Sequence, residues 1–111
     1  PSAATQHLMN ANRLAIMRTD AVLVNTSRAS LIDMDALHTS LRSGKGFAGL
    51  DVYEQEPVPA EQPLRKLPNT LLTPHVGFVC EPVFKNFDNG VAECLAAWVQ
   101  GQPLVRTTTG K

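Results

Sequence analysis

Three short apolar stretches, each followed directly by a turn with polar side chains, limit the folds open to this chain. They span Ala21–Asn25, Phe47–Val52 and Thr70–Thr73. Nearly continuous apolar stretches of this length are typical of strands that are buried on both faces of a parallel sheet. The segment between the first two fits one helix, so the order strand, helix, strand predicts a right-handed βαβ unit.

Capping residues and apolar spacing predict the helices. Asn10 is suited to cap a short helix through Met17, and Asp33 to cap a helix over roughly residues 34–43. Residues 63–67 fit one helical turn, and a long amphipathic helix is expected from about Glu81 to Gln100. Its apolar positions, spaced three and four apart, are interpreted as core or domain contact: Phe84, Phe87, Val91, Cys94, Leu95 and Trp98.

These elements predict an α/β fold with about three parallel strands and flanking helices. A complete dinucleotide-binding domain contains two such halves, so the chain represents an incomplete doubly wound, Rossmann-like domain. We expect the glycine loop that binds a pyrophosphate to lie outside it.

Composition excludes several classes of function. Ten basic and ten acidic residues cancel, so no global field favours nucleic acid or a membrane surface. No apolar stretch approaches the roughly 20 residues of a membrane span. Cys80 and Cys94 lack metal-like spacing, so we expect no metal site and reduced thiols in a cytoplasmic protein. The start at Pro1 shows no signal-peptide pattern and suggests a processed chain or a fragment.

The three predicted strands deliver three chemically active side chains to one edge of the sheet. Arg28 follows the first strand, Glu56 the second and His75 the third. Pro74 cannot continue a strand ladder, so the chain turns there, at the carboxyl edge where open α/β sheets bind ligands. Taken singly, Arg28 could be a surface ion-pair residue, Glu56 part of a solvated acidic loop, and His75 a structural turn histidine.

Three motifs resemble those of the D-isomer-specific 2-hydroxyacid dehydrogenase family. Residues 22–28, VLVNTSR, resemble its arginine motif, residues 49–57, GLDVYEQEP, its acidic motif, and residues 72–77, LTPHVG, its histidine motif. The order and spacing also match. The resemblance implies that residues 1–105 are the C-terminal half of an NAD(P)-binding domain, followed by a polar tail at 106–111. One departure is Ala29, where the family usually has glycine.

The resemblance implies hydride transfer between NAD or NADP, with NAD favoured, and C2 of a small 2-keto or 2-hydroxy acid. His75 would act as acid and base, Glu56 would orient it, and Arg28 would bind the substrate carboxylate. The implied cofactor-binding residues are Thr26, Ser27, Arg28, Asp51, His75 and Gly77.

Further expectations concern the whole protein. The resemblance implies a homodimer for the full-length enzyme and no activity for 111 residues alone. Two alternatives remain: a non-catalytic NAD-sensing interaction protein on the same scaffold, or a truncated chain that exposes an apolar sheet face and therefore associates.

Overall fold

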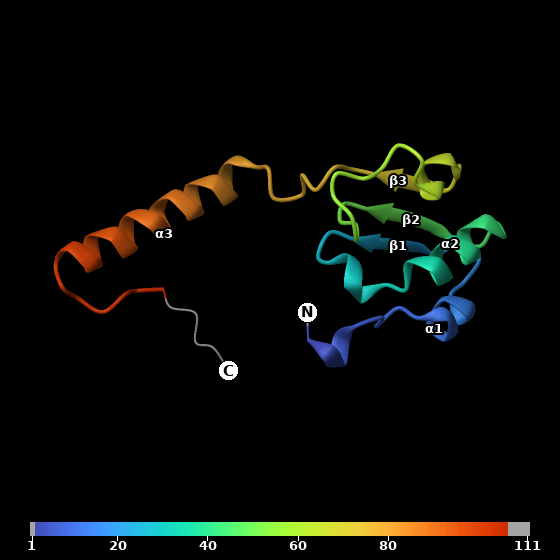
Figure 1. The fold of residues 1–111 in the computed structure, drawn as a ribbon, viewed down its shortest axis with the longest axis horizontal. Helices are drawn as coiled ribbons and strands as arrows, with labels where there is room; N and C mark the ends of the chain where they lie inside the picture. Colours follow the sequence, from blue (N-terminus) through green and yellow to red (C-terminus); the bar gives the residue numbers. More distant parts are fainter. Residues whose placement is uncertain (1, 107–111) are drawn as a thin grey trace. The chain divides into compact units, whose positions relative to one another are not determined.

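The computed structural model describes residues 2–106, which form two compact units that divide after Val76 (Figure 1). Residues 2–76 contain all the strands of this part of the chain, and residues 77–106 contain one long helix. Of the predicted polar tail, residues 107–111 lie outside the described residues. All three predicted active side chains belong to the first unit.

The first unit is built on a parallel three-stranded sheet in the order β1–β2–β3 (Figure 1). The strands are β1 (Val22–Asn25), β2 (Phe47–Leu50) and β3 (Thr70–Leu72). The register aligns Asn25 with Leu50, and Leu50 with Leu72, so all three strands end at one edge. This confirms the predicted α/β fold, although each strand is one or two residues shorter than expected.

The helices of the first unit begin at the predicted caps. The side chain of Asn10 accepts from the Arg13 amide before α1 (Ala11–Ile16), and Asp33 accepts from the Ala36 amide before α2 (Met34–Arg42). Short 3-10 turns complete the unit: η1 (Ala3–Thr5), η2 (Ala29–Leu31) and η3 (Pro63–Lys66). Among described residues other than glycine, positive φ occurs at His7 and His75, so Ala29 needs no glycine-like conformation.

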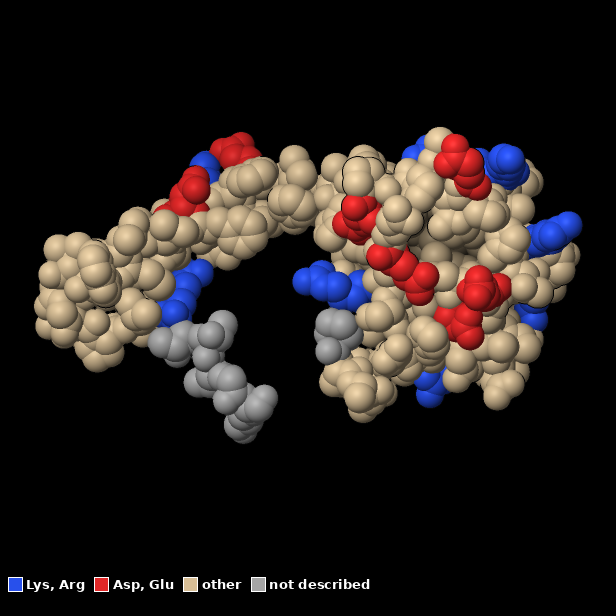
Figure 2. All heavy atoms as spheres, in the orientation of Figure 1, with Lys and Arg blue, Asp and Glu red and all other residues tan. Residues whose placement is uncertain are grey.

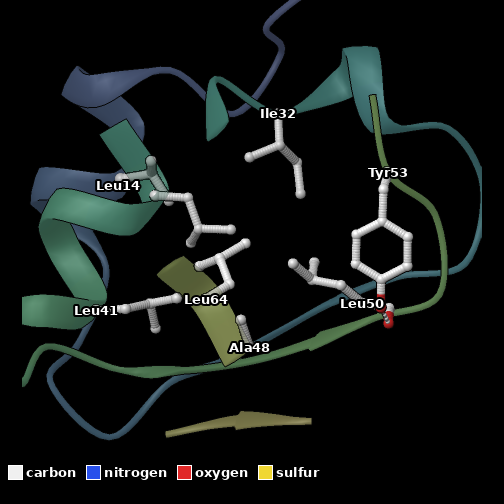
Figure 3. Packing of buried hydrophobic residues seen from close by; sticks show 8 residues of the cluster. Leu14, Ile32, Leu41, Ala48, Leu50, Tyr53 and Leu64 are labelled. Carbon is white, nitrogen blue, oxygen red and sulfur yellow. Dashed lines mark hydrogen bonds between the residues drawn. The ribbon is translucent and has the colours of Figure 1, made fainter. Parts of the chain in front are cut away.

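The core lies on one face of this sheet. Ala48 and Leu50 project from β2 towards Leu14 of α1, Leu41 of α2 and Leu64 of η3 (Figure 3). Burying a leucine side chain contributes about 2 kcal/mol through the hydrophobic effect. The helices between the strands therefore pack on the sheet and hold the strands in register, so the polar loops all leave the sheet at one edge.

The opposite face of the sheet is exposed, which corrects the expectation of strands buried on both faces. Val24 and Leu71 align through Gly49 in the register and are 65% and 70% exposed, and Val22 and Phe47 extend the same face. The apolar stretches are compatible with two-sided burial, but residues 2–76 supply helices for one face only. Residues 2–76 therefore leave the other, apolar face without a covering helix.

The second unit is organised by α3 (Glu81–Val99), one residue shorter than predicted, with Pro82 in its first turn. Its apolar stripe, including Phe87, Leu95 and Trp98, is exposed. Arg106 returns to the helix, where it pairs with Glu93 at 3.2 Å. Gly90 makes room for this contact, because a Cβ there would lie 2.9 Å from the Arg106 guanidinium.

Charge is dispersed, as the balanced composition predicts. On the visible face of the sheet unit, acidic and basic groups are interspersed, and an acidic group at the upper rim adjoins basic ones (Figure 2). Within residues 2–106, no helix combines the length and apolar character needed to cross a bilayer.

Candidate active site

The loop after β1 is shaped by the buried side chain of Asn25. Its amide donates to the Arg28 carbonyl at 2.9 Å, and its carbonyl oxygen accepts from the Ser27 amide at 3.1 Å. This arrangement turns the chain sharply as it leaves the sheet. Thr26, Ser27 and Arg28 are exposed, and the Arg28 guanidinium donates to the Ser27 carbonyl at 2.7 Å.

The loops after β2 and β3 bring Glu56 and His75 together. Oε2 of Glu56 lies 2.7 Å from Nδ1 of His75, and Oε1 accepts from the Tyr53 amide at 2.9 Å. The hydrogen bond from His75, with that from the Tyr53 amide second, lowers the pKa of Glu56 below its ordinary value. The carboxylate is therefore kept charged beside the imidazole.

His75 has a left-handed backbone, with φ of 57°. This conformation is uncommon outside glycine, although asparagine, aspartate and histidine adopt it more often than other residues. Its amide donates to the Thr73 carbonyl at 3.1 Å, closing a tight turn around Pro74. Backbone strain of this kind is concentrated at functional sites, where surrounding contacts hold it in place.

Asp51 supports the histidine turn from beneath. The residue is 3% exposed, and its Oδ1 accepts from the Thr73 hydroxyl at 2.5 Å and from the Val76 amide at 2.9 Å. Burial of a charged group is costly unless it is hydrogen-bonded, and these donors supply that compensation. Because Thr73 and Val76 lie on either side of His75, one carboxylate fixes both ends of the turn.

A cavity of about 560 Å³ opens beside the Glu56–His75 pair. Its polar lining includes both members of the pair and Arg65, and its remaining walls are mainly apolar. The lining residues are Tyr53, Glu56, Pro57, Val58, Arg65, Leu72, Thr73, Pro74 and His75. The pair therefore faces a space large enough for a small ligand.

The structure thus places the sequence-predicted residues at one edge but in different roles. Glu56 and His75 are in direct contact, Asp51 is buried beneath them, and Thr26, Ser27 and Arg28 form the exposed loop after β1. Gly77 begins the second unit. Contacts that hold the pair come from the segments around Asp51 and Tyr53.

Sequence reasoning missed three supporting residues: Asn25, Tyr53 and Thr73. Asn25 could have been recognised, since asparagine directly after an apolar strand often shapes a turn through its side chain. The contacts of Thr73 with Asp51 and of Tyr53 with Thr73 give no comparable local signal, because they join residues 22 and 20 positions apart.

The sequence contains one G-x-G-x-x-G pattern, at Gly44, Gly46 and Gly49. Here it connects the end of α2 to β2. A pyrophosphate-binding loop has the reverse context, since it leaves a strand and opens a helix. These glycines therefore do not form that loop. Among residues 2–106, moreover, no cluster of three or more His, Cys, Asp or Glu side chains could hold a metal ion.

Comparison with known proteins gives consistent matches. The profile described as "D-isomer specific 2-hydroxyacid dehydrogenase, NAD binding domain" matches residues 1–77. Glyoxylate reductase from Korarchaeum cryptofilum is 40% identical over 99 residues, covering 88% of this chain and 30% of that protein. The chain therefore spans under a third of the length of this curated relative.

Two solved structures share both the fold and part of the sequence. The TT0316 protein from Thermus thermophilus superposes with a TM-score of 0.89 at 35% identity, covering 98% of this chain and 35% of that one. An NADPH-dependent glyoxylate/hydroxypyruvate reductase from Sinorhizobium meliloti, in complex with NADP and malonate, gives a TM-score of 0.84 at 34% identity. That match covers 97% of this chain and 34% of the reductase.

Proposed function

The chain belongs to the D-isomer specific 2-hydroxyacid dehydrogenase family, and we propose that it carries the proton-transferring edge of such an enzyme. The reaction is hydride transfer between NAD or NADP and C2 of a small 2-keto or 2-hydroxy acid. The observation that carries this proposal is the 2.7 Å contact between Glu56 and His75 beside a cavity at the carboxyl edge of a parallel sheet.

His75 is the acid and base of the proposed reaction. Glu56 engages Nδ1, so proton transfer is assigned to Nε2. When a keto acid is reduced, negative charge develops on the C2 oxygen, and protonated His75 donates a proton to it. In the oxidative direction neutral His75 accepts the hydroxyl proton. Glu56 orients the ring, because its carboxylate lies 2.7 Å from Nδ1 and leaves Nε2 for the substrate.

Arg28 is the proposed anchor for the substrate carboxylate. A guanidinium presents two parallel N–H groups that match a carboxylate and fix its orientation, which a lysine cannot reproduce. Its exposed position after β1 allows the side chain to extend from its present contact with the Ser27 carbonyl. The same cation would polarise the neighbouring keto group.

The β1 loop and Asp51 fit the nicotinamide end of the cofactor, whose bound ring supplies or accepts the hydride. Thr26 and Ser27 are exposed at the strand end, and the buried Asp51 carboxylate, whose Oδ1 accepts from Thr73 and Val76, lies at the same edge. We propose that Asp51 accepts from the nicotinamide amide, and that Gly77 provides backbone against the ring. The pyrophosphate-binding loop would then belong to another part of the enzyme.

We further propose that these residues work only within a longer chain. The segment corresponds to 30% of the glyoxylate reductase from Korarchaeum cryptofilum, so the 111 residues alone should not turn over a keto acid. A homodimer of the full-length enzyme remains a prediction from the family resemblance. Steady turnover of a keto acid by the isolated chain would contradict this part of the proposal.

The rival interpretation is a non-catalytic NAD-sensing protein. Such a protein must bind the cofactor but needs no residue that transfers a proton. A charged glutamate held against Nδ1 of a histidine in a strained turn is difficult to explain by cofactor binding alone. This geometry favours catalysis, because general acid–base chemistry needs an oriented imidazole.

The decisive experiment is a chimera. The 99-residue segment of the Korarchaeum cryptofilum enzyme that aligns with this chain is replaced by the present sequence, and NADH or NADPH oxidation is followed with glyoxylate and hydroxypyruvate. Turnover that disappears with His75→Ala, while cofactor binding persists, supports the proposal. A folded, cofactor-binding chimera whose turnover equals that of its His75→Ala variant would refute it and favour the sensor.

A further inference from the structure

Tyr53 is a buried residue that the reaction described above does not use. Its ring lies beside Leu50 within the core, and the residue is only 8% exposed (Figure 3). The hydroxyl lies 2.7 Å from the Leu50 carbonyl and 2.9 Å from the Thr73 carbonyl. A hydroxyl has a single proton, so Tyr53 shares one donor between the ends of β2 and β3.

Tyr53 also contacts the other side of the pair through its backbone. Its amide donates to Oε1 of Glu56 at 2.9 Å, while Oε2 of the same carboxylate meets His75. The Thr73 carbonyl that accepts from the Tyr53 hydroxyl also accepts from the His75 amide at 3.1 Å. One residue is therefore a single hydrogen bond from Glu56 and two from His75.

Satisfying the two carbonyls does not account for the hydroxyl. Both carbonyls have other donors, since Leu50 accepts from the Thr73 amide at 3.0 Å and Thr73 accepts from the His75 amide. The hydroxyl is therefore not required to satisfy an otherwise orphaned carbonyl. Phenylalanine would fill nearly the same volume in the core. The distinctive effect of the oxygen is to link the ends of β2 and β3, and the loops that carry Glu56 and His75 follow these two strands.

We propose that Tyr53 is a positioning residue for the Glu56–His75 pair, with its hydroxyl joining the ends of β2 and β3 and its amide holding the Glu56 carboxylate. The description of that pair as catalytic rests on the proposed function. The ring anchors this connection in the core, so the orientation of the pair is set by the packed part of the fold. Loss of the hydroxyl would allow the two loops to separate without removing either member of the pair.

The test measures the pair directly in this chain, through the side-chain carboxyl ¹³C and imidazole ¹⁵N signals of isotope-labelled protein followed against pH. The His75 hydrogen bond is the main cause of the lowered pKa of Glu56. Tyr53→Phe is therefore expected to raise the pKa of Glu56 towards its ordinary value and to change the Nδ1 signal of His75. Ile32→Val is the matched control, because it removes one buried methyl group from the same core.

A shift with Tyr53→Phe that is absent in Ile32→Val supports the proposal. Unchanged signals in a folded Tyr53→Phe protein, or equal shifts in both variants, overturn it. If Tyr53→Phe does not fold, the unmodified protein decides the matter: a Tyr53 hydroxyl proton protected from exchange supports the proposal, and one exchanging as fast as an exposed phenol overturns it. No turnover is measured, so a failed dehydrogenase assay would leave this result intact.

Discussion

Oε2 of Glu56 lies 2.7 Å from Nδ1 of His75, although the two residues are 19 positions apart in the chain. The contact arises because β2 and β3 are parallel neighbours that end at the same edge. The Tyr53 amide holds the second oxygen of the carboxylate, and the histidine is mounted on a turn fixed by Asp51. The pair is thus a product of strand order and register, and its chemistry can be tested by removing one group at a time.

Replacing His75 with asparagine should abolish proton transfer while preserving the turn. Asparagine tolerates the left-handed conformation that His75 adopts at φ 57°. Loss of a general acid and base typically reduces turnover by about 10² to 10⁴-fold. We expect a loss of this size in kcat of the chimeric enzyme measured at saturating cofactor.

His7→Asn is the matched control for that substitution. His7 also has a positive φ, of 50°, and is exposed in the N-terminal segment. Its replacement makes the same chemical change at a residue with the same left-handed backbone conformation and should leave kcat unaffected. Equal losses in both variants would show that the effect of His75→Asn is not catalytic.

The lowered pKa of Glu56 predicts how stability depends on pH. A carboxyl whose pKa is lower in the folded than in the unfolded state contributes stability above its unfolded value, which is about 4.5. That contribution is lost as pH falls through the lowered folded value. The free energy of unfolding of Glu56→Gln should therefore be lower than that of the unmodified protein at about pH 7, and this difference should shrink as the pH falls to about 3. Denaturant unfolding across this pH range measures it.

Glu54→Gln provides the comparison for the acid range. Glu54 is an exposed carboxylate two residues earlier on the same loop. Its removal changes the net charge by the same amount without touching His75. A stability difference for Glu56→Gln that stays constant down to the acid end would mean that the hydrogen bond with His75 does not form in solution.

The sequence was sufficient to predict the sheet edge, because apolar length, caps and strand order are local signals. Asn10 and Asp33 cap α1 and α2 as predicted, and the three strands align in the predicted parallel order. Parallel topology then places the residues after each strand on one side. The proximity of Glu56 and His75 follows from that topology without knowledge of any individual contact.

Other features depend on distant partners and could not be predicted. The left-handed turn at His75 is held by Asp51, 25 positions from the Val76 amide that it accepts from. Exposure of the second sheet face depends on which elements cover it, so the alternation of Val22 and Val24 with half-buried Leu23 appears only in the structure. An apolar strand sequence is compatible with burial on both faces of the sheet, but it does not show that both faces are covered.

Removing the Thr73 hydroxyl should destabilise the fold. The hydroxyl donates a hydrogen bond of 2.5 Å to the carboxylate of Asp51, a residue with 3% exposure. This bond helps to compensate the cost of burying the charged group. Loss of such a partner leaves a buried acceptor partly unsatisfied, which costs about 1–3 kcal/mol. Thr73→Val should lower the free energy of unfolding by that amount in urea titration. Thr39→Val, which removes an exposed hydroxyl from α2, should change it by less than about 0.5 kcal/mol.

The uncovered sheet face predicts self-association of the isolated chain. Val24 and Leu71 are mutually aligned apolar side chains with 65% and 70% exposure, and contiguous apolar surface of this kind is uncommon on soluble monomers. Replacing both with threonine keeps a β-branched residue at Val24, introduces one at Leu71, and reduces apolar area on the face. In sedimentation velocity, the double variant should shift towards monomer at a concentration where the unmodified chain associates.

Ile16→Thr separates this surface from general hydrophobicity. Ile16 is 84% exposed at the end of α1 and lies outside the sheet face. Its replacement lowers the exposed apolar area outside the sheet face and should leave the sedimentation profile unchanged. If Ile16→Thr dissociates the chain as well as the double variant does, association is not specific to the sheet face. An unmodified chain that is already monomeric would contradict the prediction, because an apolar sheet surface open to water favours association by the same physics that folds a core.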